Sequence, residues 1–357
     1  MFVLFNDLNA QFSYTFTNAG ATGRLGPTQA QINSTYSLTN LNGLVQVSQQ
    51  GIQNFTVLTN GLYKIIAAGA KGGDGAGKTG GYGAVMVGEF YLNSGTVLKV
   101  LVGQVGGSRQ GFGINDAGAG GGGTFVTDIN NNPLIVAGGG GGAGFSENGL
   151  PGDTSVNGSN SNSNSGIGGI NGGGGGGAVL GAAGTSISPG GVGLSCSYGS
   201  GGGGFYTNGG NNCNGAPPYL AGESFINGGK GGNANSALNG IEGGFGGGAG
   251  VGNRAAGGGG WSGGGGDGGI TAGGGGGSYN SGINQINNNG LNNGNGYVII
   301  SRVLCASIVQ TSSINCSGQN NGSLTSIIYG GSPPYTYTWL PSGGNAPSAN
   351  GLASGTY

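Results

Sequence analysis

Residues 256–277 read AGGGGWSGGGGDGGITAGGGGG, and runs of this kind dominate the chain from about residue 138 to residue 277. Glycine accounts for 97 of the 357 residues. Because glycine loses more backbone entropy on ordering than any other residue, an ordered tract of this composition needs many contacts per residue. Glycine has no side chain to supply them. The main-chain amides and carbonyls therefore decide whether this tract folds.

Short runs of β-branched and aromatic residues, separated by Asn and Gly turns, bracket the glycine tract on both sides. Such runs predict strands, and no stretch shows the 3.6-residue apolar period of a helix. The predicted strands are 12–17, 44–48, 52–58, 62–68, 82–92, 96–104, 123–128 and 133–137 before the tract and 296–303 after it. We therefore predict an all-β fold, a jelly-roll-like sandwich (12–137 and 296–303) that carries residues 138–295 as an insertion.

The predicted strands on either side would fix both ends of the inserted glycine tract. The tract itself could adopt either of two conformations. One is a flexible linker. The other is a bundle of left-handed polyglycine II helices, which have three residues per turn and no internal hydrogen bonds, so that neighbouring helices must satisfy their amides and carbonyls. The strict G-X-Y period of collagen is absent. We predict the bundle, with turns at Asn and Ser clusters. Single aromatic residues would seal its edges: Phe145, Phe205, Tyr206, Phe245, Trp261 and Tyr279.

Charged side chains are scarce, with 9 Lys and Arg, 10 Asp and Glu, and a net charge of -1. Nucleic-acid binders need clustered cations, so we expect no nucleic-acid partner. The sequence has no histidine, which removes the commonest general base and metal ligand and every catalytic triad that uses it. No run of 18 or more apolar residues predicts a transmembrane helix.

The sequence GGDGAGKT (72–79) satisfies the phosphate-loop pattern GxxxxGK[ST] and follows a predicted strand. A phosphate loop must open a helix, whose N-terminal amides hold the phosphates. Here a further strand is predicted from residue 82. We therefore interpret residues 72–79 as a solvated hairpin loop and expect no nucleotide.

Two other patterns are considered for chemistry. Asp128, Asn130 and Asn132 have the alternate spacing of a calcium loop, but the glycine at the sixth position and the closing glutamate are missing, so a hairpin turn is predicted. Glycoside hydrolysis needs two carboxylates in a cleft. Most of the acids lie in glycine loops, and Glu89 is expected to face outward from its strand. We predict a non-enzymatic protein without cofactor or metal.

Four cysteines are candidates for disulfide bonds: Cys196, Cys213, Cys305 and Cys316. With no CxxC pair and no histidine, a zinc site is not expected. In an exported chain, pairing Cys196 with Cys213 and Cys305 with Cys316 keeps each bridge inside one domain. A closing cysteine beyond residue 357 is the alternative partner of Cys316. Residues 1–11 suit either the remnant of a signal peptide or a first strand.

Several motifs recur in order along the chain. They are GATGRLGPTQAQINSTY (20–36), GIQNFTV (51–57), TNGLYKIIAAGAKGG (59–73), LVGQVGG (101–107), GGGGTFV (120–126), PLIVAGGGGG (133–142), GGFGGGAG (243–250), AGGGGWSGGGGDGG (256–269) and GGGGGSY (273–279). The series resembles the glycine-rich extracellular domain of receptor tyrosine kinases of the anaplastic lymphoma kinase and leukocyte tyrosine kinase type and of their bacterial relatives. The resemblance covers residues 12–303 and implies a tumour-necrosis-factor-like sandwich carrying packed polyglycine helices. The sequence shows no kinase domain, and the receptors' ligand-contact residues cannot be matched, so cytokine binding is not carried over.

The motifs CSGQNNGS (316–323), GGSPPYTYTW (330–339) and GLASGTY (351–357) are similar to the SprB-type immunoglobulin-like repeat of Bacteroidetes surface adhesins. Such repeats continue into a last strand and a closing cysteine, so we expect residues 304–357 to be a truncated repeat. An incomplete repeat leaves an open sheet edge.

Composition and resemblance together predict a secreted or cell-surface adhesin or matrix protein, located outside the cell or on its outer surface. Its rigid head would bind an extracellular surface, a glycan or a matrix protein through many weak contacts. The alternatives are a purely structural component of an envelope or slime, and the accessory region of a secreted degradative enzyme.

Overall fold

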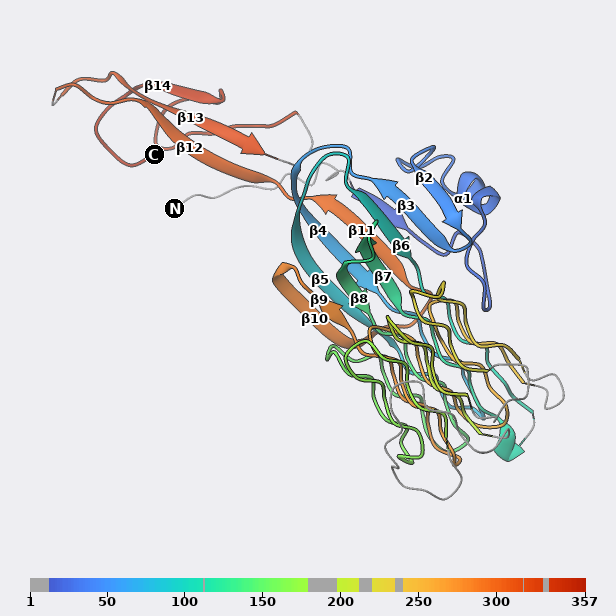
Figure 1. Cartoon of the computed structure of the whole chain (residues 1–357). Coiled ribbons are helices and arrows are strands. Elements are labelled where there is room, and N and C mark those ends of the chain that lie inside the picture. Colours follow the sequence, from blue (N-terminus) through green and yellow to red (C-terminus); the bar gives the residue numbers. More distant parts are fainter. Residues whose placement is uncertain are drawn as a thin grey trace. The chain divides into compact units, whose positions relative to one another are not determined.

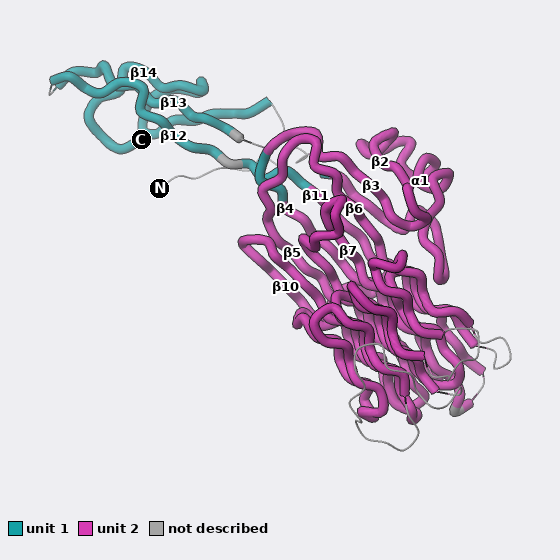
Figure 2. The backbone as a smooth tube through the Cα atoms, in the orientation of Figure 1, with its two compact units in different colours: residues 1–13, 61–63, 301–357 teal, residues 14–60, 64–300 magenta. Residues whose placement is uncertain are grey.

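The structure is a computed structural model that describes residues 13–111, 113–178, 198–211, 220–234, 240–316, 318–329 and 334–357. The chain divides into two compact units (Figure 2). One consists of residues 14–60 and 64–300, and the other of residues 1–13, 61–63 and 301–357. The predicted signal-peptide remnant, residues 1–11, lies outside the described residues.

Two antiparallel sheets form a β-sandwich (Figure 1). The five-stranded sheet has the order β1 (Ser13–Phe16), β11 (Tyr297–Arg302), β4 (Gly61–Ala68), β5 (Gly83–Leu92) and β10 (Ile283–Asn292). The six-stranded sheet has the order β2 (Val45–Gln49), β3 (Ile52–Thr56), β6 (Val97–Leu101), β7 (Thr124–Asp128), β8 (Pro133–Ala137) and β9 (Tyr279–Asn280). Every strand predicted from the sequence is present, with ends that differ by a few residues, and the all-β sandwich is confirmed.

The core of the sandwich follows from the alternation of side chains along its strands. Phe16, Phe55, Ile65, Leu98 and Ile135 are at most 1% exposed. The ring of Phe16 meets that of Phe55 edge to face, with centroids 5.5 Å apart. Burying a side chain of this size contributes about 1.5–3 kcal/mol, so these strands hold the sandwich together without help from charged groups.

Besides the two-residue strand β9 and a 3-10 turn at Gly113–Asn115, two longer elements differ from the sequence prediction. A short helix, α1 (Gln29–Thr35), forms where none was predicted. A capping box begins it, in which the Thr28 side chain accepts from the Gln31 amide and the Gln31 side chain accepts from the Thr28 amide. The second element is β10, which lies inside the predicted insertion but pairs with β5 as an edge strand of the sandwich. Its side chains are largely exposed, so it lacks the apolar alternation that marks the other strands.

The segment 118–123 shows the polyglycine II arrangement in its hydrogen bonds. Its six successive amides donate, at 2.8–3.0 Å, to the carbonyls of Ala143, Gly107, Ala249, Gly140, Gln104 and Gly246. The first three acceptors lie on three different segments, and the next three lie on the same segments in the same order, each three residues earlier in the chain. This rotation is that of a helix with three residues per turn whose amides point outward.

The carbonyls of the same segment face three further directions. Those of residues 118–122 accept, in order, from the amides of Ala256, Gly73, Gly244, Gly259 and Ala70. The segment is therefore bonded to six neighbouring stretches: 70–73, 104–107, 140–143, 256–259, and the two sides of the turn at 245–247. Packing six neighbours around one helix satisfies the main chain on all sides.

Segments 139–144 and 256–261 repeat this pattern. The amides of 139–144 donate in order to Gly259, Ala70, Leu150, Ala256, Gly73 and Glu147, and those of 256–261 to Gly118, Ser200, Gly274, Gly121, Gly203 and Gly277. Both series rotate through three neighbours with a period of three residues. Side chains have no room in this packing: a Cβ built on Gly122 would lie 1.7 Å from the Phe245 carbonyl oxygen. The predicted bundle of polyglycine helices is thus present, and the linker alternative is wrong for these segments.

The bundle draws on more of the chain than the insertion predicted at 138–295. Residues 69–82, between β4 and β5, and residues 103–107 and 118–123, between β6 and β7, supply bundle segments as well. In Figure 1 these segments run side by side with the later glycine segments at one end of the sandwich. Loops that join neighbouring strands of the sandwich therefore form the interior of the bundle.

The aromatic residues of the tract, predicted to seal the edges of the bundle, lie mainly at the edge where the bundle meets the sandwich. Phe205, Phe245 and Trp261 are at most 8% exposed. They pack in one cluster with side chains from the strands β3, β6, β7 and β8, namely Ile52, Leu101, Phe125 and Val136. Tyr279 stacks on Trp261, with centroids 4.5 Å apart. Phe145 and Tyr206, 38% and 53% exposed, lie at the surface.

The smaller unit contains a three-stranded antiparallel sheet with the order β12 (Cys305–Ser312), β13 (Gly322–Tyr329) and β14 (Ser348–Leu352). Trp339, Ala349 and Leu352 form its small core, and Leu324 and Tyr357 pack against them. The Trp339 indole nitrogen donates to the Ala346 carbonyl at 2.9 Å. This core is modest, as expected for about fifty residues.

Candidate binding site

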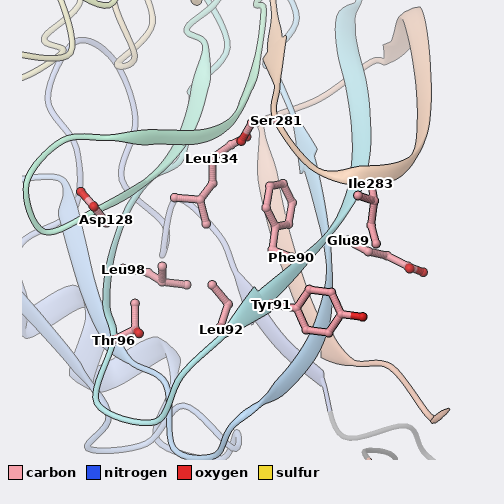
Figure 3. A pocket seen from close by; sticks show the side chains of 10 residues that line it. All are labelled: Glu89, Phe90, Tyr91, Leu92, Thr96, Leu98, Asp128, Leu134, Ser281 and Ile283. Atoms are coloured by element: carbon pink, nitrogen blue, oxygen red, sulfur yellow. The ribbon is translucent and has the colours of Figure 1, made fainter. Parts of the chain in front are cut away.

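A pocket of about 390 Å³ opens between the two sheets of the sandwich (Figure 3). Phe90 and Leu92 from β5, Leu98 from β6 and Leu134 from β8 turn toward one another and form its apolar wall. The polar rim consists of Thr96, Asp128 and Ser281. A pocket of this size and lining suits an apolar group of a ligand, held by a few hydrogen bonds at its rim.

The strand β5 gives the two sides of this region different chemistry. Phe90 and Leu92 are 8% and 7% exposed and face the pocket, whereas Glu89 and Tyr91 point away from Leu98 and Leu134 (Figure 3). This alternation follows from the two-residue period of a strand. Tyr91 is 79% exposed, and Glu89 accepts a hydrogen bond from Asn284 at 2.7 Å. Glu89 thus faces outward, as the sequence predicts.

Asp128 fixes the hairpin between β7 and β8. Its carboxylate accepts from the amides of Asn130 and Asn132 at 2.8 Å and from the Asn132 side chain at 2.7 Å. Partial burial raises the pKa of Asp128, but the hydrogen bonds from Asn132 and Asn130 and the charge of Lys99 outweigh it and hold this pKa below its usual value. The residues with calcium-loop spacing therefore form the predicted hairpin turn. The main-chain amides of this turn donate to the Asp128 carboxylate.

The phosphate-loop pattern at 72–79 forms a tight turn. Gly75 and Lys78 pair across it, and Ala76 and Gly77 both have positive φ, 47° and 75°, as in the primed turns of hairpins. Asp74 accepts from the Gly80 amide at 2.7 Å and from Lys71 at 2.5 Å. The chain then enters β5 at Gly83, and on the way the Gly81 amide donates to the Gly141 carbonyl. Residues 72–92 contain no helix N-terminus that would hold a phosphate.

The remaining candidate residues are the cysteines and the acids. Cys196 and Cys213 lie outside the described residues. Cys305 is the first residue of β12. Cys316 is an exposed free cysteine. The disulfide pairing of these two residues stays a prediction. Within the described residues, the acids and cysteines form no cluster of three or more that would hold a metal ion. The sequence analysis did not predict the pocket, because its walls come from strands of both sheets and local patterns do not show which strands face one another.

Comparison with known proteins finds a relative for part of the chain. No family model matches it. A stretch of 105 residues is 34% identical to the leukocyte tyrosine kinase receptor of Mus musculus, which corresponds to 28% of this chain and 12% of the receptor. The chain thus spans a small part of that relative's length. The match supports the resemblance of this segment to receptors of this type.

The described part of the chain contains no helix with the length and hydropathy to cross a bilayer. The similarity to a receptor segment is compatible with an extracellular location.

Proposed function

We propose that this chain is an extracellular, non-enzymatic adhesin or matrix protein, in which the glycine bundle acts as a rigid head. The observation that carries the proposal is the packing of 118–123, 139–144 and 256–261, three polyglycine helices whose amides each rotate through three neighbours. Such a bundle fixes its main chain without large side chains. It is suited to holding surface loops in a constant arrangement.

Exposed aromatic and uncharged polar groups suggest what the head contacts. Tyr91, Tyr206 and Tyr82 are 79%, 53% and 40% exposed, and the charged fraction of the chain is 5%. A tyrosine ring offers an apolar face and a hydroxyl at low conformational cost, which suits a glycan or another neutral surface. Single contacts of this kind are weak, so display of several copies is needed for firm adhesion. An SprB-type repeat at 304–357 would supply the start of such a display stalk.

A printed glycan array and chitin- and cellulose-coated beads test the proposal. The chain is biotinylated and applied as a monomer and as a streptavidin tetramer. We expect the tetramer to bind at least one glycan or bead surface about 100-fold more tightly than the monomer. Replacing Tyr91→Ala and Tyr206→Ala together should weaken this binding at least about tenfold, whereas Leu38→Ala, at a residue that is 97% exposed, should not. Absence of tetramer binding on every surface contradicts the proposal.

A second candidate is a structural component that assembles with itself. Residues 303–357 contain no charged residue, and β12 is an edge strand of its sheet. Edges without charge are prone to pair with other chains. Light scattering that rises with protein concentration in the absence of any ligand favours this candidate over the adhesin, and a constant monomer mass excludes it.

A further inference from the structure

Asp267 is a carboxylate held inside the glycine bundle. The residue is 0% exposed and follows the glycine run 263–266. Its main chain is bonded within the bundle, because its amide donates to the Ala255 carbonyl and its carbonyl accepts from the Gly199 amide, both at 2.8 Å. The bundle therefore holds the main chain at this residue, and its side chain is buried.

The two oxygens of this carboxylate have different surroundings. Oδ1 accepts from the hydroxyls of Ser163 and Thr271, the latter at 2.8 Å. Oδ2 is buried and has no hydrogen-bond partner among the described residues. It points toward Gly269, where a built Cβ would lie 3.7 Å from Oδ2 and also 3.7 Å from the Ser163 Cβ. Oδ2 thus faces the space between the loops 161–165 and 267–271.

Among the described residues, no ion pair involves Asp267. The ion pairs of the described residues join Lys71 to Asp74 and Lys230 to Glu223. The sequence contains no lysine or arginine between Arg109 and Lys230, which includes the whole loop 161–165. Burial of an unpaired charge is strongly unfavourable, and native proteins pair such groups or coordinate them to a metal.

Hydroxyl oxygens lie beside this carboxylate, where Ser163 and Thr271 bond to Oδ1. The hydroxyl of Ser163 lies 2.7 Å from that of Ser165, and the Thr271 hydroxyl reaches the same carboxylate. A third loop adjoins them, because the Ser146 amide donates to the Ile270 carbonyl at 2.9 Å and Glu147 accepts from Asn162. Nitrogen and sulfur ligands are absent from these described loops, so a hard cation fits and zinc does not.

We propose that Asp267 Oδ2 binds a calcium ion between the loops 161–165 and 267–271. The hydroxyl oxygens of Ser163 and Thr271 complete its protein ligands, together with main-chain carbonyls and water. Calcium accepts six to eight oxygens in irregular geometry, whereas magnesium demands a near-ideal octahedron. The ion would neutralise the buried carboxylate and tie adjoining loops together at this end of the bundle. This site is independent of the proposed adhesin function.

Thermal unfolding of the whole chain in EDTA and in 2 mM CaCl₂ tests the site, with 2 mM MgCl₂ as the comparison. With the affinity typical of extracellular calcium modules, we expect calcium to raise the Tm by about 3 °C or more. Asp267→Asn should abolish the calcium shift. In EDTA it should unfold at or above the Tm of the wild type, since the variant buries no charge.

Two further variants keep the test decisive. Glu223→Gln removes a carboxylate that pairs with Lys230 elsewhere in the bundle, and it should retain the full calcium shift. Ser163→Ala keeps the charge but removes a ligand, so it should need at least about three times more calcium for half of the shift. The proposal is overturned if calcium leaves the wild-type Tm unchanged, if magnesium shifts it equally, or if Asp267→Asn still responds.

Discussion

Gly120 lies inside the polyglycine helix 118–123, where a Cβ would fall 1.9 Å from the Gly257 carbonyl oxygen and 2.9 Å from the Ala249 nitrogen. Neither neighbour can move alone, because both belong to bonded helices. Ala119, the next residue, is tolerated at 0% exposure since its methyl group packs with Ala249, Ala256 and other small side chains. Within this one helix, position 119 therefore accommodates the methyl group of alanine, whereas the adjacent position 120 does not.

We expect Gly120→Ala to lower the free energy of unfolding by about 3 kcal/mol, as overpacked sites do, when measured by urea denaturation. Gly294→Ala is the matched control, because no atom lies within 4 Å of a Cβ built there, and it should change stability by less than about 0.5 kcal/mol. Equal stability of the two variants would show that packing between helices does not restrict position 120.

The hairpin of β7 and β8 is an element whose stability depends on pH. The ionised carboxylate of Asp128 accepts the bonds that hold the turn, and the pKa of Asp128 is lowered from 3.8. A lowered folded-state pKa contributes stability above the unfolded-state pKa, and this contribution is lost as the pH falls through the folded-state pKa. We expect Asp128→Asn to be less stable than the wild type at pH 7 by about 1 kcal/mol. This difference should shrink as the pH falls below 3.8 and through the lower folded-state pKa of Asp128.

Thermal melts of the wild type and of Asp128→Asn between pH 2 and pH 7 measure this effect. Asn130→Ala provides the control, since Asn130 bonds to Asp128 through its main-chain amide. It should keep the pH dependence of the wild type. A constant difference between Asp128→Asn and the wild type over the whole range would mean that the charge of Asp128 does not act on the hairpin.

For the larger unit as a whole, amide exchange separates an ordered bundle from a flexible tract. The amides of 118–123, 139–144 and 256–261 are bonded to other segments, so they exchange only when the bundle opens. We expect hydrogen–deuterium exchange measured by mass spectrometry to show peptides from these segments as slow as peptides from β5 and β6. Peptides around Leu38, which is 97% exposed, provide the fast reference. Exchange of the glycine segments at the rate of this reference contradicts the bundle.

Local pattern was enough to predict most of the sandwich. Strands such as β4 and β5 carry β-branched and aromatic residues between Gly and Asn turns, and this signal depends only on neighbours in the chain. The strand β10 was missed because an exposed edge strand rich in asparagine has no apolar alternation. The helix α1 was missed although Thr28 and Gln31 have the spacing of a capping box, a signal that a search for apolar periodicity does not use.

The sequence alone determined that the glycine tract must bond through its main chain, because glycine offers no other group. Only the tertiary structure decided which segments pair, and therefore that residues 69–82, 103–107 and 118–123 join the bundle. Glycine-rich segments are nearly identical to one another. Their side chains therefore do not specify which segment pairs with which, or in what register. The pocket at Phe90 and Leu134 and the unpaired Oδ2 of Asp267 likewise arise where distant segments meet. Such sites depend on how the strands and glycine helices stack, and a pattern along the chain does not contain that information.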